Sequence, residues 1–196
     1  AAAGNYQPAS RGASQINYVV IHTIQGSYSG AISWFKNPAA NVSSHYVVRS
    51  SDGAITQMAD DSDIAYHDAC FNSQSIGIEH EGFVDDPGKW YTDAMYKASA
   101  KLTAWLCDKY NIPKDHQHIM GHGETPDCST HYDPGGGWDW TKYMNYVKGQ
   151  TCKAQCAWDG NLINKDCSVT KCTAVGASCV NDAQGLRCAS VFCVDK

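Results

Sequence analysis

The sequence has no long apolar run and no surplus of basic residues. No apolar stretch approaches the roughly 20 residues of a membrane-spanning helix. Fifteen lysines and arginines stand against twenty aspartates and glutamates, which gives a net charge of −5. This charge argues against nucleic acid or an anionic membrane as the main partner. The 196 residues also contain no internal repeat, so we expect one domain with a small appendage.

Paired Cys-x-x-Cys knuckles are missing as well, although the chain holds ten cysteines. Seven of them follow Gln150, and this density is typical of a disulfide scaffold formed in an oxidising compartment. The alternative, zinc bound by a cysteine cluster, lacks its usual spacing. The start Ala1-Ala2-Ala3 is compatible with a processed secretory terminus, so we expect a secreted or extracytoplasmic protein.

Composition divides the chain into three parts. Residues 1–13 are small and polar and are predicted to form an arm, and residues 14–150 form the main domain. Residues 151–196 form the cysteine-rich appendage, which has too few large apolar side chains to hold a core without disulfides.

Apolar patterns predict the elements of the main domain. In the run Ile16–Ile21, apolar residues occupy both odd and even positions, as in a central strand buried on both faces. The segments His45–Arg49 and Ile55–Met58 flank the turn Ser51-Asp52-Gly53 and indicate a hairpin. A long helix is predicted over Asp93–Tyr110, with Thr92 as N-cap. Its expected core stripe is Met95, Ala98, Leu102, Trp105 and Leu106.

Three side chains suit a catalytic zinc site. His122 and Asp133 flank a loop rich in Gly, Pro, Asp and Ser, which can fold back so that both face one point. His22 follows the apolar run Ile16–Ile21, at the end of a strand where sites on open sheets usually lie. Three protein ligands with one open position is the usual arrangement for catalytic zinc. The alternative for His22 is a hydrogen-bonded core histidine.

Two carboxylates share one face of another predicted strand. The segment Ser75–Gly82 alternates, which places Glu79 and Glu81 on one face and Ile76, Ile78 and His80 on the other. One interpretation is a solvated edge strand. The other is a general base beside a metal ion.

Five motifs occur in an order that resembles a known family. They are Val20-Ile21-His22-Thr23, Ser44-His45-Tyr46-Val47-Val48, Ile64-Ala65-Tyr66-His67, Ser75-Ile76-Gly77-Ile78-Glu79, and Gly121-His122 with Asp133-Pro134-Gly135. Together they resemble the type 2 N-acetylmuramoyl-L-alanine amidases, a superfamily that includes the peptidoglycan recognition proteins. The resemblance covers roughly Ser14 to Lys148, and the segment beyond Cys152 matches nothing.

The resemblance implies a central mixed β-sheet flanked by helices, with one zinc ion in a surface groove. It implies His22, His122 and Asp133 as ligands and Glu79 as the carboxylate near the metal-bound water. His131 stands where many members carry lysine, and an imidazole there can hydrogen-bond a developing oxyanion. The implied reaction cleaves the amide between the lactyl group of N-acetylmuramic acid and L-alanine of the stem peptide.

The expected substrate is therefore peptidoglycan or a muropeptide, bound by a monomer. Candidates to line the groove are the aromatic residues Tyr46, Tyr66, Trp90, Tyr132 and Trp138, with a core position as the alternative for each. His67 is expected to contact substrate or to orient the metal-bound water. Two alternatives stay open: a non-catalytic peptidoglycan-binding module, and a zinc peptidase that cuts within the stem peptide. All three ligand positions are filled, which favours the enzyme.

Cysteine counts suggest how the appendage is attached. The main domain holds three cysteines and the tail seven, so full oxidation within one chain requires a disulfide between them. Cys70 and Cys128 lie in loops that should border the groove, and we expect them to pair. Cys107 would then anchor the tail, or would remain free as a small buried hydrophobe.

Overall fold

The computed structural model describes residues 1–126 and 131–149, and beyond them only the backbone of five short strands. The chain divides into two compact units, Ala1–Lys148 and Gly149–Lys196. The strands of the first unit are β1 (Tyr6–Gln7), β2 (Tyr18–Thr23), β3 (Tyr46–Val48), β4 (Ile55–Gln57), β5 (Ile64–Ala65), β6 (Ser75–His80) and β7 (Ile119–Gly121). Its helices are α1 (Tyr28–Phe35), α2 (Pro87–Trp90), α3 (Asp93–Tyr110) and α4 (Trp140–Val147), with short 3₁₀ helices η1 (Ala69–Gln74) and η2 (His122–Glu124).

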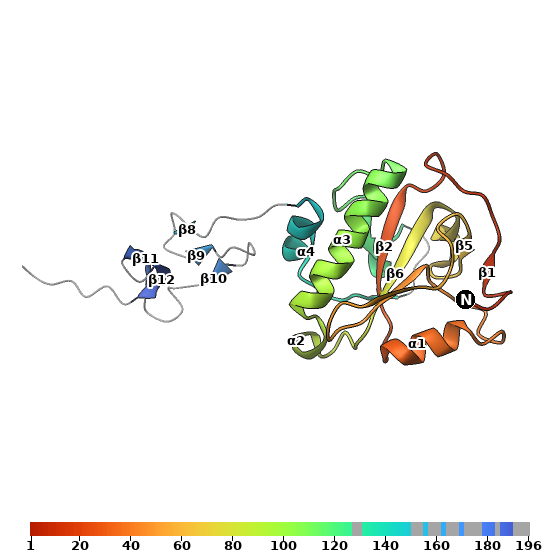
Figure 1. Ribbon diagram of the computed structural model, residues 1–196, viewed down its shortest axis with the longest axis horizontal. Coiled ribbons are helices and arrows are strands. Elements are labelled where there is room, and N and C mark those ends of the chain that lie inside the picture. The colour runs from red at the N-terminus through yellow and green to blue at the C-terminus, as the bar shows by residue number, and fades with distance from the viewer. Residues whose placement is uncertain are drawn as a thin grey trace, which may run out of the picture. The chain divides into compact units, whose positions relative to one another are not determined.

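The main sheet is mixed and has the strand order β4-β3-β6-β2-β7 (Figure 1). Strand β2 pairs in parallel with β6 and β7, and β6 pairs in parallel with β3. The predicted hairpin is present, because β3 and β4 are antiparallel. The expected central strand is β2, and its core residues Val19, Val20 and Ile21 are fully buried. Strand β6 is also internal, so the edge-strand interpretation of its carboxylates was wrong.

Helices α3 and α4 cover one face of this sheet. Side chains of Ile21, Ile78 and Val48 form one core cluster with residues of both helices. Helix α3 has the predicted bounds, and Thr92 caps it by accepting a hydrogen bond from the Met95 amide. Asn111 ends it in a left-handed conformation. The helix is therefore specified by local signals that agree with its packing.

The buried stripe of α3 differs from the one expected. Trp105 is 50% exposed, whereas Ser99 and Thr103 are fully buried. Both hydroxyls lie within hydrogen-bond distance of the Tyr143 hydroxyl on α4. Because these polar side chains pair with each other inside the core, an apolar pattern alone assigns the helix face incorrectly.

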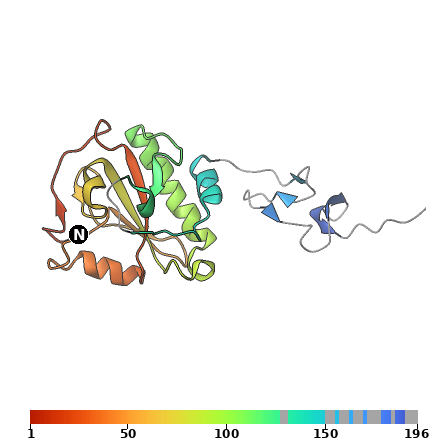
Figure 2. The same cartoon turned by 180° about the vertical axis from the view of Figure 1, so that it is seen from behind.

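The opposite face of the sheet is covered by α1 and η1 (Figure 2). Val47 of β3 packs against Ala31 and Phe35 of α1, and Val20 packs against Phe71 of η1. Ser27 caps α1 by accepting a hydrogen bond from the Gly30 amide. This second face carries the groove described below.

The first thirteen residues pack onto the unit and do not form a separate arm. Strand β1 pairs with β5. The side chain of Asn5 is buried and donates to the carbonyls of Phe35 and Asn37. Arg11 is buried as well, and its guanidinium donates to backbone carbonyls that include that of Ser75. These polar side chains satisfy buried backbone groups, so a polar segment serves as part of the core edge.

The second unit holds short antiparallel strands. Strands β8 (Gln155–Cys156), β9 (Leu162–Ile163) and β10 (Val169–Thr170) form one sheet, and β11 (Ser178–Asp182) pairs with β12 (Gly185–Ala189). The side chains of the seven tail cysteines, and therefore the expected disulfide framework, lie outside the described residues. None of the described helices has the length and apolar character needed to cross a membrane.

The cysteines of the first unit have different states. Cys70 forms a disulfide, and its expected partner Cys128 lies outside the described residues. Cys107 is a free, buried thiol, so the expectation that it anchors the tail was wrong. It belongs to the core cluster on the inner face of α3, not to an edge of that helix.

Cys107 should resist alkylation in the folded protein and react after unfolding. Its side chain is 1% exposed, and burial raises the pKa of its thiol to about 12. Both effects remove accessible thiolate, which is the reactive form. Peptide mapping by mass spectrometry, with iodoacetamide added before or after unfolding and no reductant, measures this. Labelling of Cys107 in the folded state, or a Cys107 peptide joined to a tail peptide, would contradict the assignment.

Candidate active site

Three parallel strands end at the same edge of the sheet, and each delivers a polar side chain there. His22 lies near the end of β2, and Glu79 is directly opposite it on β6. His122 directly follows β7, which is the other neighbour of β2. Carboxyl ends of parallel strands are where open α/β sheets usually place their sites.

Asp133 reaches this edge on a loop that folds back beside η2. The Gly123 amide donates to the Asp133 carbonyl over 3.0 Å. A Cβ atom at Gly121 would lie 2.7 Å from the Pro134 ring, and one at Gly123 would lie 2.9 Å from the Tyr132 backbone. Both positions therefore need glycine for the loop to approach. The Thr23 amide donates to Asp133 Oδ2 over 3.1 Å and fixes the carboxylate.

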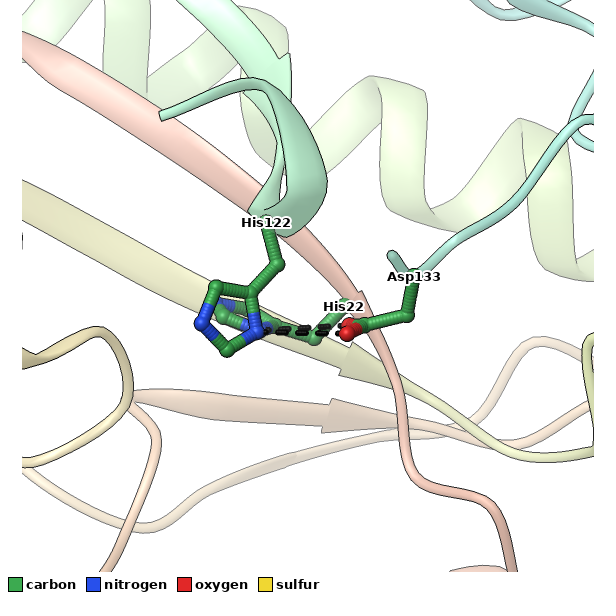
Figure 3. Close-up of side chains that lie close together, drawn as sticks. All are labelled: His22, His122 and Asp133. Atoms are coloured by element: carbon green, nitrogen blue, oxygen red, sulfur yellow. Dashed lines mark hydrogen bonds and ion pairs between the residues drawn. The ribbon is translucent and has the colours of Figure 1, made fainter. Parts of the chain in front are cut away.

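The three predicted ligand side chains converge on one point (Figure 3). The distance from His22 Nδ1 to His122 Nδ1 is 3.0 Å. Asp133 lies 3.2 Å from His122 Nδ1 through Oδ1 and 3.5 Å from His22 Nδ1 through Oδ2. Ligand atoms of a tetrahedral zinc ion are about 3.3 Å apart, since each lies about 2.0–2.1 Å from the metal. The donor set and its spacing therefore fit zinc.

The outer nitrogen of each histidine ligand also has a partner. His22 Nε2 lies 3.0 Å from His67 Nδ1, and His122 Nε2 lies 3.1 Å from Asp68 Oδ1. These contacts leave the two Nδ1 atoms to face the common point. Asp68 was not identified from the sequence, because nothing in the local pattern distinguishes it from a loop carboxylate.

Burial and charge together set the protonation of the cluster. Burial alone would lower the pKa of His122, but the carboxylates of Asp133 and Asp68 raise that pKa to about 9. Burial would likewise raise the pKa of Asp133, yet hydrogen bonds from His122 and His22 hold it far below its ordinary value. The carboxylate thus stays ionised beside imidazoles, which is the form that binds a cation.

Glu79 and Glu81 have different environments. Burial raises the pKa of Glu79 to about 7, and its Oε2 atom is buried without a hydrogen-bond partner. Glu79 lines a cavity of about 410 Å³ together with all three predicted ligands. Glu81 instead accepts hydrogen bonds from the backbone amides of Tyr28 and Ser50. Glu81 therefore ties loops together, and Glu79 is the carboxylate that faces the cavity.

His131 lies at the rim of the same cavity. Its side chain is 65% exposed, and its ring stacks on His122 with centroids 4.4 Å apart. Its Nδ1 atom lies 3.8 Å from Asp133 Oδ1. An imidazole so placed is accessible to a bound substrate.

Of the three predicted substrate contacts, Tyr46 and Trp138 do not line the cavity over the ligands, although Trp138 borders a separate cavity with His131 and Asp133. Tyr46 points to the face covered by α3, and its hydroxyl donates to Asp61 over 2.6 Å. Trp138 is 4% exposed and packs in the same core against His80 and Tyr91. Strand alternation explains Tyr46, because Val47 is the residue that points toward the groove side. His67 does line the cavity, yet both its ring nitrogens are engaged, with His22 and Ser75.

A second cavity continues the first along α1. It has a volume of about 260 Å³ and shares Ile24, Gln25, Phe35 and Glu79 with the cavity over the ligands. Trp34 lines it and is 51% exposed. Sequence reasoning missed Trp34, although a large aromatic residue on the outer side of a short amphipathic helix is a usable signal.

The histidine at position 45 has a structural role. His45 is fully buried, and its Nδ1 accepts a hydrogen bond from the Gly77 amide over 3.0 Å. Its Nε2 lies 2.9 Å from the Arg11 guanidinium. Both nitrogens are thus occupied away from the ligands.

Comparisons with known proteins agree with this geometry. Residues 12–136 match the family model described as N-acetylmuramoyl-L-alanine amidase. The chain is 39% identical over 165 residues to N-acetylmuramoyl-L-alanine amidase A of Achromobacter lyticus, covering 76% of this chain and 91% of that protein. It is 34% identical over 116 residues to 1,6-anhydro-N-acetylmuramyl-L-alanine amidase AmpD of Haemophilus influenzae, covering 55% of this chain and 59% of that protein.

Solved structures show the same fold. PlyL has a TM-score of 0.57 at 17% identity, covering 76% of this chain and 92% of its own. The Staphylococcus aureus hydrolase AmiA, solved in complex with its ligand, has a TM-score of 0.59 at 17% identity, covering 74% and 77%. The family match over most of the first unit and the identity to amidase A show that the chain belongs to the N-acetylmuramoyl-L-alanine amidase family.

Proposed function

We propose that His22, His122 and Asp133 hold one zinc ion with which this amidase hydrolyses the amide between N-acetylmuramic acid and L-alanine in peptidoglycan. The observation that carries the proposal is the convergence of three buried ligand atoms, all within 4.8 Å of one another, on the floor of a cavity that Glu79 also lines. When bound, zinc lowers the pKa of a water molecule to about 7 and polarises the substrate carbonyl.

Glu79 supplies the base in this mechanism. Its unpartnered Oε2 accepts a proton from the attacking water and returns it to the departing amine nitrogen. Burial raises the pKa of this carboxyl to about 7, which makes it a stronger base than an exposed glutamate. His131, exposed at the rim, donates a hydrogen bond to the oxyanion that forms from the carbonyl.

The groove around these residues suits a neutral, extended substrate portion. Lys and Arg are absent from the described residues that line the two joined cavities. The stem peptide carries carboxylates, whereas the glycan is largely uncharged. Trp34 presents an aromatic face of the kind on which sugar rings stack. We therefore assign the α1 side of the groove to the sugar and propose Trp34 as a substrate contact.

The site is complete within one chain, which supports action as a monomer. Peptidoglycan lies outside the cytoplasm, and the disulfide at Cys70 requires an oxidising environment. Both observations support a secreted enzyme.

The His122→Ala variant should lose bound zinc and activity together. Removing one of three protein ligands from a catalytic site weakens the metal affinity severely. The control is His116→Ala, since His116 pairs with Glu124 at the surface and should keep one zinc per chain. Metal analysis and product analysis on purified muropeptides measure the two effects. Full zinc in His122→Ala would refute the ligand assignment, and peptides that do not begin with L-alanine would refute the assigned bond.

Glu79→Gln should keep zinc and lower turnover by about 10²–10⁴-fold, because an amide cannot accept the proton. The matched control is Glu81→Gln, which should lower the free energy of unfolding while each folded molecule keeps its turnover number. Zinc content, thermal unfolding and turnover are measured for both variants. A dead Glu81→Gln beside an active Glu79→Gln would show that the wrong carboxylate was chosen.

Trp34→Ala should raise KM on peptidoglycan by about tenfold with little change in kcat, since loss of an aromatic contact that the bound sugar covers costs about 1.4 kcal/mol at a binding hot spot. Trp105→Ala is the matched control, because Trp105 is also half-exposed but lines a different cavity, next to Lys109. Steady-state kinetics on the two variants decides the point. Equal KM values for Trp34→Ala and the unmodified enzyme would remove Trp34 from the substrate groove.

A further inference from the structure

We propose that the dipeptide His67–Asp68 is the positioning device of the metal centre, with each of its side chains holding one ligand imidazole from the side away from the metal. The inference rests on the proposed zinc site. His67 Nδ1 lies 3.0 Å from His22 Nε2, and Asp68 Oδ1 lies 3.1 Å from His122 Nε2. Two consecutive residues therefore reach both histidine ligands, of which His22 lies on β2 and His122 begins η2.

Metal binding at the Nδ1 atoms of His22 and His122 decides which atom is the donor in each of these two hydrogen bonds. A ligating Nδ1 carries no proton, so His22 and His122 must each carry theirs on Nε2. His122 then donates to Asp68, which needs no rearrangement because a carboxylate is an acceptor. His22 donates to His67 Nδ1, which therefore has to be an acceptor.

Because His67 Nδ1 must accept, the hydrogen bonds that connect His67 to the backbone are also determined. A neutral His67 that accepts at Nδ1 carries its proton on Nε2, which lies 3.2 Å from Ser75 Oγ. The Ser75 hydroxyl donates to the Phe71 carbonyl over 2.7 Å. In this series of hydrogen bonds, which connects His22 through His67 and Ser75 to Phe71, every donor has an acceptor. This series of hydrogen bonds fixes the tautomer of His22 and ends at the backbone of η1.

The dipeptide itself is held in place from several sides. The backbone amides of His67 and Asp68 both donate to Asn72 Oδ1, over 2.9 and 2.7 Å. Cys70, two residues further on, is in a disulfide. A Cβ atom at Gly77 would lie 2.5 Å from the His67 ring, so the ring packs directly on the bare backbone of β6. Few arrangements of the loop satisfy all of these contacts.

Asp68 gives independent support for a functional role. It is 2% exposed, and its Oδ2 atom is buried without a hydrogen-bond partner. A carboxylate that served only to hold the loop would be expected to use both oxygens, as Glu81 does with two backbone amides. Burying a half-satisfied carboxylate is unfavourable unless a positive partner compensates. His122 beside a bound cation supplies that partner.

The adjacency of the two residues predicts coupling between the two ligands. Because the two side chains leave adjacent backbone atoms, a shift of the loop caused by either substitution changes both outer contacts, so the two effects should not be independent. The double variant His67→Phe/Asp68→Ala should therefore weaken zinc binding by less than the product of the single effects.

The test measures zinc affinity of the full chain by competition with a chelator. Asp68→Ala and His67→Phe should each weaken zinc binding about 10–100-fold, as outer-shell partners of metal ligands generally do. Asp68→Asn and His67→Gln, which keep an acceptor at each position, should recover part of the loss. The matched control is Asp115→Ala, because Asp115 accepts from His118 over 2.7 Å in a surface pair remote from the ligands. Its zinc affinity should equal that of the unmodified protein.

Two further readouts separate positioning from a role in folding. Thermal unfolding of the zinc-free variants measures fold stability alone. The visible absorption of the Co²⁺-substituted proteins reports ligand geometry and should change in Asp68→Ala and His67→Phe. Unchanged zinc affinity and an unchanged Co²⁺ spectrum in folded Asp68→Ala and Asp68→Asn would overturn the inference. If His122→Ala also keeps its zinc, the proposed metal site fails; if His122→Ala loses zinc, only the inference fails.

Discussion

The alternation of side chains along parallel strands is the constraint on which the rest of the molecule depends. Ile21 joins the core under α3 and α4, while its neighbour His22 points to the groove. Ile78 and Glu79 divide in the same way on the next strand. A register shift of one residue would send both polar side chains into the apolar core. The position of the site is therefore fixed by the apolar face of the same strands.

Much of this arrangement could be predicted from the sequence, because its signals are local. The apolar run before His22 identified a buried internal strand, and Thr92 marked the start of α3. The mixed sheet followed from the family resemblance and is confirmed. The predictions that failed concerned which face of its strand or helix a residue occupies. Tyr46 and Trp105 are aromatic, but only the packing partners of their elements decide which is buried.

Other features depend on contacts between distant segments. The role proposed for Asp68 depends on its contact with His122, and Glu81 is held by the amides of Tyr28 and Ser50. Cys107 lies in the core on the same face of α3 as Ser99 and Thr103, whose hydroxyls pair with that of Tyr143. No single-sequence pattern contains these relations. They concern polar groups satisfied by tertiary contacts, which hydrophobic periodicity does not register.

Burial and charge conflict at Glu79, which lines the cavity over the predicted ligands. Most buried polar side chains of the described residues have partners, but Glu79 Oε2, like Asp68 Oδ2, does not. That leaves a carboxylate in an environment that opposes its charge, which is unfavourable for stability. The same burial raises the pKa of Glu79 to about 7 and so increases its affinity for a proton near neutral pH. A hydrogen bond to this oxygen would stabilise the fold but would lower the affinity of Glu79 for a proton, which the proposed role as general base requires.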